Sequence, residues 1–594
     1  MKFCAVDVET TGDVPQFKSA ALWSDDAKLY TESHDEFIIA MRWHAQKGFK
    51  FAAHNAEYDG NVLLWNRGED FTIHYINDSY DCGYWTWGTE RQRSQLWDTV
   101  RLSAGMSLAE LGEALGLPKW PTPKALLGED DWRPSWVCDE HSKRECIECY
   151  NLRDAEIVWA YCNMLREWME SNLCTLHRSL PGNAVALWKQ WDPGMQRIIV
   201  DPRIKALGRA ALHGGRVEVF KYGALRAVNT YDSRAHYAAI LASIELPDTD
   251  TLVYRESVND VTDVLEGEGV IDATVWVEPQ HIPPLPAVHD DHLYFPVGTF
   301  RGQWPICELR NALGWGATIL KVHRAAWTHQ MMRPFAITAQ ALLDLREQAR
   351  RHGDPKQLIY KFLANAIPGR LGMREAQTRR IYRRWRPGLT RTQTIGYDLE
   401  SSANYVFLAK EISHVAPSAT ANIVWASQVL GHGRMRLFGR LLLAGPSAVY
   451  CDTDSVHSTS ALGVGDGSPG SWIDTGLWDS ALYLGPKLYR LESDTDGATV
   501  RAKGIPRKHA AEYIESGRAQ FQTTLSVREA IHRGLPAGTW VEAHREMGHA
   551  PGYRTIHDPA VLRDRSGYSP TSPVVFASDY DGSVTMTNDI MREQ

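Results

Sequence analysis

The stretch AVYCDTDSVH, Ala448 to His457, places two aspartates one residue apart in a run that otherwise reads as a buried strand. Side chains two positions apart on a strand leave the same face, so we expect Asp452 and Asp454 to hold two negative charges close together. Such a pair is costly unless a cation lies between the two carboxylates. The stretch therefore predicts a cation-binding site.

A third carboxylate is expected from elsewhere in the chain, because Mg²⁺ prefers octahedral oxygen ligation that it shares with substrate phosphates. The segment NTYDSRAHYAAILAS supplies Asp232 at the end of a β-like run, with Tyr237 five residues later. The segment YKFLANAIPGRLGM places Lys361 and Asn365 on one helical face. A compact lysine ammonium suits phosphate oxygens, so this helix is a candidate phosphate-binding element.

The order of these three segments resembles motifs A, B and C of the family B DNA polymerases. The resemblance implies a DNA-directed DNA polymerase, which adds dNTPs to a primer 3′ end by two-metal catalysis with Mg²⁺ or Mn²⁺. Asp232 and Asp454 would be the main metal ligands, Asp452 an auxiliary ligand, and Tyr237 a steric gate against ribonucleotides. The alternatives are a core tyrosine for Tyr237 and a surface turn for the Asp-x-Asp pair.

Two motifs depart from the family pattern. The resemblance assigns Lys361 and Asn365 of motif B to nucleotide binding. Motif B reads NAIPG at residues 365–369, where Asn-Ser-x-Tyr-Gly is usual. Motif A has Ala235 in place of serine. We expect Pro368 to kink or end its helix. Two alternatives therefore stay open: a nuclease with a degenerate polymerase body, and a non-catalytic DNA-binding protein. A non-catalytic protein would need neither these aspartates nor the N-terminal acidic residues described below, so their presence argues against it.

Two further segments match the family's DNA contacts. LHGGRVEVF resembles the Tyr-x-Gly-Gly linker that contacts template, with Leu212 in place of the tyrosine and with Gly214 and Gly215 matching. GPKLYRLE supplies Lys487 and Tyr489, which match the Lys-x-Tyr motif that steadies the primer strand.

The N-terminal third carries acidic residues in ordered pairs. FCAVDVETTG puts two acids on one strand face, and two later segments each pair residues at the helical i, i+4 spacing. The residues are Asp7 and Glu9, Asn55 and Asp59, and Tyr150 and Asp154. Four converging carboxylates are tolerable if they share two divalent cations at a scissile phosphate.

This pattern resembles the DEDD-type 3′–5′ proofreading exonucleases of the tyrosine subtype. The resemblance implies that Asp7, Glu9, Asp59 and Asp154 bind metal and that Tyr150 orients the attacking water. It also implies contacts with single-stranded DNA, from Thr10, Asn55, Tyr58, Ser107 and Leu108.

Four residues between these segments have the spacing of a structural zinc site. VCDEHSKRECIECY reads C-x2-H-x4-C-x2-C, through Cys138, His141, Cys146 and Cys149. That spacing suits one tetrahedral zinc ion, while reduced surface cysteines with a solvated histidine are the alternative.

The resemblance implies an α/β and α+β multidomain fold, with a ribonuclease H-like exonuclease domain followed by a right-hand polymerase. The expected divisions are 1–185 exonuclease; 186–339 linker and first part of the palm with a terminal-protein-type insertion; 340–373 fingers; 374–404 processivity and strand-displacement insertion; 405–480 second part of the palm; and 481–594 thumb and C-terminal region. The segment Arg374 to Arg391 has seven arginines and one glutamate with interleaved aromatics, which suits DNA; a solvated hairpin is the alternative.

The overall pattern is most like the protein-primed phage or plasmid polymerases, so the expected partners are primer-template DNA, dNTPs and a terminal protein. The net charge of −8 across 594 residues means that DNA contacts must come from local patches. No run of about 18 apolar residues is present. We expect a cytoplasmic monomer with no membrane segment, engaged in replication of a viral or plasmid genome.

Overall fold

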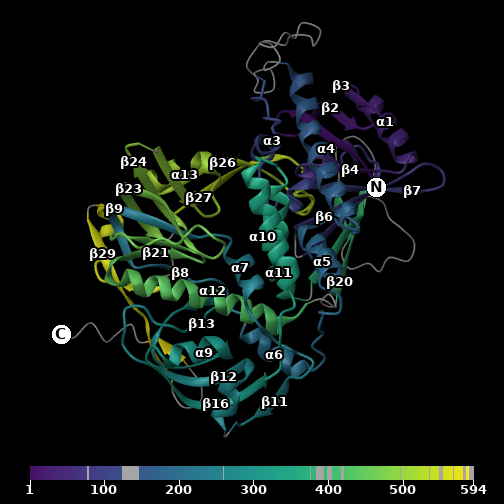
Figure 1. Cartoon of the computed structure of the whole chain (residues 1–594). Helices are drawn as coiled ribbons and strands as arrows, with labels where there is room; N and C mark the ends of the chain where they lie inside the picture. Colours follow the sequence, from purple (N-terminus) through teal and green to yellow (C-terminus); the bar gives the residue numbers. More distant parts are fainter. Residues whose placement is uncertain are drawn as a thin grey trace.

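The computed structural model describes the chain apart from short stretches. Outside the described part lie residues 77–78, 124–145, 259, 375, 383–393, 398–404, 416–420, 496, 534, 548–552, 566, 579–583 and 587–594. Figure 1 shows an N-terminal body, a central β-rich body and a lower body, with the helices α10 and α11 standing between the first two. Among the described residues, no helix is long and apolar enough to cross a membrane.

The N-terminal body is built on one sheet with helices on both faces. The sheet order is β19-β20-β18-β5-β6-β7-β4-β1-β2-β3. The strands from the N-terminal part are β1 (Lys2–Thr11), β2 (Gln16–Ser24), β3 (Lys28–Thr31), β4 (Phe49–Ala53), β5 (Asp70–Ile76), β6 (Ser79–Trp87) and β7 (Gln92–Asp98). Because side chains alternate along β1, Phe3 and Ala5 pack in one core with α4 (Ile147–Ser171), while Cys4 and Val6 pack in another with α1 (His34–Gln46).

The far edge of this sheet comes from the segment expected to be a processivity insertion. Its described strands are β18 (Ala376–Tyr382) and β19 (Thr394–Tyr397), and the next strand, β20 (Tyr405–Val415), joins the same sheet although it was expected in the second part of the palm. Strand β18 pairs antiparallel with β5, with Thr378 opposite Ile76. The described part of this insertion is therefore a continuation of the N-terminal sheet.

The central body is an antiparallel sheet of order β25-β24-β23-β9-β22-β21-β8, with β29 also paired to β9. Its strands are β8 (Val217–Val219), β9 (Lys221–Ser233), β21 (Ala448–Asp452), β22 (Ser455–Ser458), β23 (Trp472–Gly485), β24 (Leu488–Ser493), β25 (Gly497–Ala502) and β29 (Tyr568–Pro573). The expected boundary at residue 480 falls inside β23, and the sheet runs on without a break to β25. That boundary needs correction, because the meander of paired strands leaves no division there.

Two antiparallel helices, α10 (Ala336–Arg351) and α11 (Gln357–Leu371), form the element expected to be the fingers. Of the two expected effects of Pro368, a kink or an end of the helix, the end does not occur, since α11 runs on to Leu371. Pro368 is buried together with Ile367 and Leu371, so packing holds the last turn although the proline lacks an N–H.

The lower body is a sheet of order β11-β16-β12-β15-β30-β31, covered by α8 (Val261–Glu266) and α9 (Ile306–Leu313). Its strands are β11 (Val253–Glu256), β12 (Glu268–Val277), β15 (Val297–Pro305), β16 (Ala317–Thr328), β30 (Val575–Ser578) and β31 (Val584–Met586). The proline-rich stretch between β12 and β15 includes one short hairpin, β13 (Ala287–His289) with β14 (His292–Tyr294).

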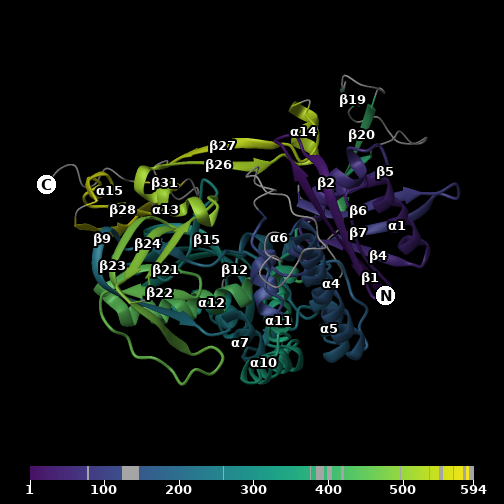
Figure 2. The same ribbon diagram turned by 90° about the horizontal axis from the view of Figure 1, so that it is seen from above.

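A long hairpin connects the C-terminal part with the N-terminal body. Figure 2 shows β26 (Arg518–Thr524) and β27 (Trp540–Glu546) reaching across to α14 (Val527–Arg533) beside β2. Val527 and Ala537 are buried in the same core as Val6 and Val8 of β1, and the Trp540 N–H donates to the Asp13 carbonyl at 2.8 Å. This hairpin therefore packs against the N-terminal body.

Candidate functional site

The two aspartates of the DTD stretch do not lie on one strand. Asp452 ends β21, Ser455 begins β22, and Thr453 and Asp454 form the turn between them. The expectation of a shared strand face is wrong, because the chain reverses at Thr453, whose φ of 59° lies in the left-handed region. The Asp454 N–H donates to the Asp452 carbonyl at 2.6 Å, which keeps the turn tight.

Asp232 joins the other two carboxylates from the neighbouring strand. It lies opposite Ser455 in the β9–β22 ladder, and the Ser233 N–H donates to the Asp454 carbonyl at 2.7 Å. Burial together with the Asp232 and Asp452 charges raises the pKa of Asp454 to about 6. The surrounding protein and the Asp452 charge also raise the pKa of Asp232. The three carboxylates thus repel one another at one place.

The residues expected to steady the primer lie next to this acidic group. The Lys487 ammonium is 2.5 Å from an Asp452 carboxylate oxygen, and the Lys487 N–H donates to the Tyr450 hydroxyl at 3.2 Å. The Tyr450 hydroxyl donates to the Asp452 carboxylate at 3.2 Å, and its ring lies 5.2 Å from that of Tyr489. Asp452 is therefore partly neutralised by the protein itself.

Tyr237 lies near the start of α7 (His236–Ser243), against the helix α12 (Ile423–Ala444). A Cβ atom added at Gly433 of α12 would lie 2.9 Å from the Tyr237 ring. Burial raises the pKa of Tyr237 to about 12; Arg434 opposes the shift, and Asp454 and Asp452 add to it. The ring is thus packed on one side and close to the aspartates.

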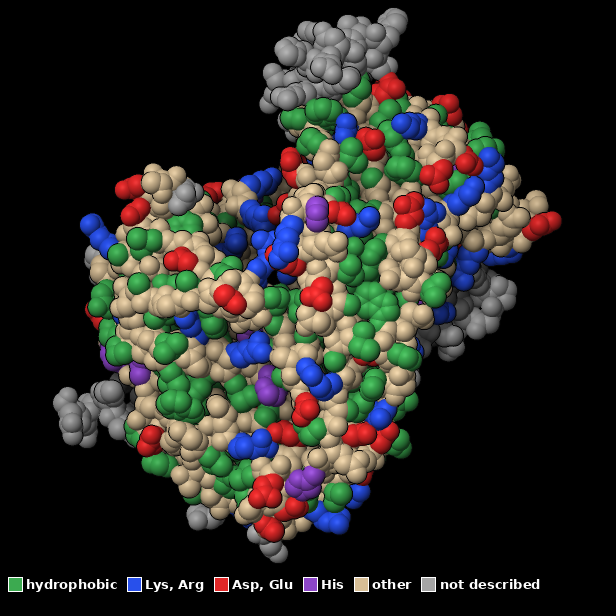
Figure 3. All heavy atoms as spheres, viewed as in Figure 1, with side chains coloured by type: hydrophobic (Ala, Val, Ile, Leu, Met, Phe, Trp, Pro, Cys, Tyr) green, Lys and Arg blue, Asp and Glu red, His purple; other side chains and the backbone are tan. Residues whose placement is uncertain are grey.

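The α11 face expected to bind nucleotide is open. Lys361 and Asn365 are exposed on one side of α11, while Ile367 and Pro368 are buried on the other. Arg346 of α10, which the sequence analysis missed, has a buried Nε with no hydrogen-bond partner, and burial together with its charge lowers the pKa of Lys361. Figure 3 shows Lys and Arg side chains gathered between the β26–β27 hairpin and α10. No sequence signal separates Arg346 from its arginine neighbours.

The linker glycines lie against the aspartate turn. A Cβ atom added at Gly215 would lie 2.5 Å from Thr453 Oγ1, whereas one added at Gly214 would meet nothing within 4 Å. Leu212, which replaces the expected tyrosine, lies near the end of α11, 3.4 Å from where a Gly372 Cβ would be.

A second acidic group forms in the N-terminal body. Asp7 and Glu9 of β1 and Asp154 of α4 bring one carboxylate oxygen each to within 4.8 Å of one another. Asp59, in α2 (Ala56–Gly60), is buried and accepts the Val8 N–H at 3.1 Å. Burial and the Asp7 charge raise the pKa of Glu9 to about 8 and raise the pKa of Asp59 strongly. Three of the predicted carboxylates therefore converge, and Asp59 lies close enough for its charge to interact with that of Asp7.

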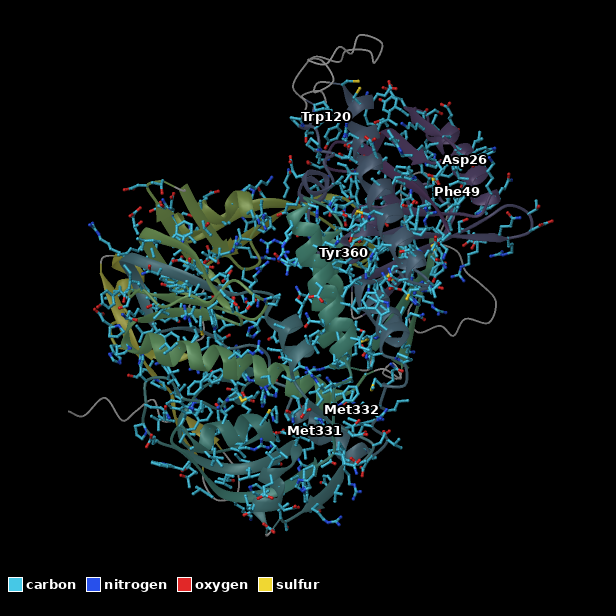
Figure 4. All side chains as sticks on the ribbon, in the orientation of Figure 1. Asp26, Phe49, Trp120, Met331, Met332 and Tyr360 are labelled. Carbon is cyan, nitrogen blue, oxygen red and sulfur yellow. The ribbon has the colours of Figure 1, made fainter. Side chains whose placement is uncertain are left out.

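A lysine that the sequence analysis missed lies among these carboxylates. Lys119 forms an ion pair with Asp154, and its ammonium is 4.3 Å from the centre of the Tyr150 ring. The next residue, Trp120, is labelled in Figure 4, and the Arg153 guanidinium of α4 lies 5.1 Å from its ring. Lys119 lies outside any helix or strand, so no periodicity marks it as a site residue.

A cleft of about 550 Å³ opens in front of Glu9. The Thr10 and Tyr58 hydroxyls lie 2.5 Å apart at its wall, and Asn55 adopts a left-handed φ of 69°. The cleft is completed by Gln522, Thr524 and Trp540 of the β26–β27 hairpin. Ser107 caps α3 (Leu108–Ala114) through a capping box with Glu110.

The zinc prediction stays a prediction. Cys138 and His141 lie outside the described residues. Cys146 is buried at the start of α4, and its sulfur accepts the Cys149 N–H at 3.4 Å.

A sequence comparison supports the assignment. The family model of DNA polymerase type B, organellar and viral, matches residues 139–405. That match covers less than half of the chain, so it shows a similarity to the type B DNA polymerases over this segment. The match supports the family resemblance and the enzyme class inferred from the motifs. No curated protein matches the sequence.

The solved structures show the fold of this chain. Phi29 DNA polymerase complexed with primer-template DNA and incoming nucleotides is 13% identical, with a TM-score of 0.67 over 92% of this chain and 99% of that one. The complex of Phi29 DNA polymerase with single-stranded DNA is 13% identical, with a TM-score of 0.64 over 91% and 99%. The predicted fold class, an exonuclease domain with palm, fingers and thumb, is therefore confirmed.

DNA polymerases use divalent metal ions, and the donor atoms of this polymerase fit them. Both acidic groups offer carboxylate oxygens, which hard divalent cations prefer. Burial and repulsion from neighbouring carboxylates raise the pKa of Asp454 to about 6 and that of Glu9 to about 8. Bound cations would remove that repulsion.

Proposed function

We propose that Asp232, Asp452 and Asp454 form the centre that adds dNTPs to a primer 3′ end. The observation that carries this proposal is the convergence of the β21–β22 turn with the end of β9. The two metal ions of such a centre, Mg²⁺ or Mn²⁺, would activate the primer 3′-hydroxyl and neutralise the leaving pyrophosphate. Asp232 and Asp454 would be the main ligands, and the ion pair with Lys487 supports an auxiliary role for Asp452.

The nucleotide-binding part of this proposal rests on α10, α11 and Tyr237. Lys361 and Asn365 face solvent on α11, and Arg346 adds a second cation for the triphosphate. Tyr237 is held against Gly433, so its ring cannot retreat in that direction from a ribose 2′-hydroxyl. This packing supports the steric-gate role.

We also propose that the N-terminal acidic group is the 3′–5′ proofreading exonuclease. Asp7, Glu9, Asp59 and Asp154 would hold two divalent ions, while Tyr150 orients the attacking water. Lys119 would hold positive charge beside the scissile phosphate. The cleft offers Thr10, Asn55 and Tyr58 to the single strand, and Ser107 and Leu108 complete the predicted contacts. Trp540 supplies an aromatic face for a base.

The partners follow from the same assignments. The Phi29 polymerase structures hold primer-template DNA, incoming nucleotides and single-stranded DNA, which supports these ligands for the present chain. Gly214, Gly215, Lys487 and Tyr489 would contact the template and primer. We propose that the lower body receives a terminal protein and that the β18–β20 extension supports processivity. The protein would act as a monomer in viral or plasmid genome replication.

A primer-extension assay of the full chain tests these proposals. With dNTPs and Mg²⁺ the labelled primer should lengthen, and without dNTPs it should shorten from its 3′ end. Shortening without any extension would identify a nuclease with a degenerate polymerase body. Binding without either reaction would identify a non-catalytic DNA-binding protein.

A further inference from the structure

The turn that carries Asp452 and Asp454 is held by the loop His213 to Arg216. The Thr453 N–H donates to the Arg216 carbonyl at 2.8 Å. A Cβ atom at Gly215 would lie 2.5 Å from Thr453 Oγ1 and 2.8 Å from Thr453 Cγ2. Gly215 therefore permits an approach so close that a Cβ atom at this position would force Thr453 to shift.

A buried arginine fixes one end of this loop. Arg216 is fully buried, ion-paired with Glu218, and donates to the Pro283 carbonyl at 2.8 Å. Its guanidinium lies 4.0 Å from the centre of the Phe295 ring. These contacts leave the Arg216 carbonyl little freedom to move away from Thr453.

A second buried arginine fixes the other end. Arg434 of α12 forms a two-bond pair with Glu308, with N–O distances of 2.7 and 2.6 Å. It also donates to the His213 carbonyl at 2.6 Å and to the Gly214 carbonyl at 3.0 Å. The same α12 packs against Tyr237 through Gly433, so one helix supports both the loop and the tyrosine.

We propose that the loop 213–216 is a positioning element for the carboxylates of the Asp452–Asp454 turn. It holds the left-handed conformation of Thr453, whose φ is 59°, through the Arg216 carbonyl on one side and contact with Gly215 on the other. This role is separate from any template contact of the loop. It rests on the proposed function of the Asp232, Asp452 and Asp454 centre.

Gly215→Ala tests the proposal because the new methyl group must displace Thr453. Misplacement by about 1 Å can lower a rate roughly 100-fold, so nucleotide addition should fall by about that factor. The Mn²⁺ concentration needed for half-maximal addition should rise, which the loss of a template contact alone would not cause. Degradation of single-stranded DNA should stay at the parent rate, which shows that the chain is folded.

Thr453→Gly provides the rescue. Glycine removes the atoms that the new methyl group meets and adopts positive φ freely. The double variant Gly215→Ala with Thr453→Gly should therefore recover most of the lost activity. Gly439→Ala, on α12, is the control, since a Cβ atom there meets nothing within 4 Å, and it should leave the Mn²⁺ dependence unchanged.

Mn²⁺ binding, measured by electron paramagnetic resonance, gives a readout independent of activity. In full-length chains that carry Asp7→Ala and Glu9→Ala, Gly215→Ala should weaken Mn²⁺ binding and Thr453→Gly should restore it. Unchanged Mn²⁺ binding with no rescue would overturn the proposal and leave the loop with a template contact alone. Asp454→Asn tests the proposed centre separately from the positioning role of the loop. If this variant still extends primers, the proposed centre itself is wrong.

Discussion

The Lys487 ammonium lies 2.5 Å from the Asp452 carboxylate, so a residue from the loop before β24 compensates one of the three central acids. Lys487→Ala should leave the Asp452 charge without its ion-pair partner beside Asp454. The rate of nucleotide addition should then fall by about tenfold, which corresponds to the free energy of one hydrogen bond to a charged group. Single-turnover extension measures the loss. Lys487→Arg, which keeps the charge, should recover part of it, and parent-like addition by Lys487→Ala would show that the pair has no catalytic consequence.

Replacing Tyr237 should admit ribonucleotides. Tyr237→Ala removes the ring that Gly433 supports, so the preference for dNTP over rNTP should fall by at least about tenfold in kcat/KM. Tyr237→Phe keeps the ring and should keep the preference. Unchanged discrimination by the alanine variant would count against the gate.

Trp540 links the C-terminal hairpin to degradation. It lines the same cleft as Glu9, and base stacking on an aromatic ring is worth about 1–3 kcal/mol, so Trp540→Ala should raise the KM for single-stranded DNA about tenfold. Trp540→Phe retains an aromatic face and is the control. A parent-like KM in the alanine variant would place the strand elsewhere.

Stability should fall in mild acid because buried imidazoles are held neutral. Burial lowers the pKa of His457 to about 3, and its Nδ1 lies 2.6 Å from the Tyr483 hydroxyl. The unfolded imidazole titrates near 6.5, so the contribution of His457 is complete above that pH and is lost as the pH falls below it. Between pH 6.5 and pH 5 this residue should cost about 2 kcal/mol.

The measurement for His457 is the heat-unfolding midpoint at pH 7 and pH 5. His457→Gln cannot be protonated in this range, so its midpoint should fall less between the two pH values than that of the parent. An equal fall in both proteins would show that His457 does not govern this pH dependence.

Local patterns predicted much of both sites. Alternation along β1 placed Asp7 and Glu9 together, and the i, i+4 spacing placed Tyr150 and Asp154 on α4, because both depend on repeats of a few residues. The prediction that Asp452 and Asp454 share a strand face was wrong. Neither residue propensity nor hydrophobic pattern reveals the left-handed backbone conformation of Thr453.

Other features depend on contacts between distant segments. Lys119 reaches Asp154 from a segment without regular structure, and Trp540 reaches the cleft of Glu9 across more than 500 residues of sequence. Pro368 stays inside α11 because its buried neighbours outweigh the lost N–H. No local pattern encodes such packing, which is why these features escaped prediction.

The central claim is that one chain carries two separate metal-dependent centres, and one labelled primer-template assayed with and without dNTPs tests it directly. Asp454→Asn should lower the rate of nucleotide addition by at least about 1,000-fold, which corresponds to several kcal/mol of transition-state stabilisation. The same variant should keep 3′–5′ degradation. The double variant Asp7→Ala with Glu9→Ala should lose degradation and keep addition. Near-parent extension by Asp454→Asn, or near-parent shortening by the double variant, would contradict the assignment of the corresponding centre.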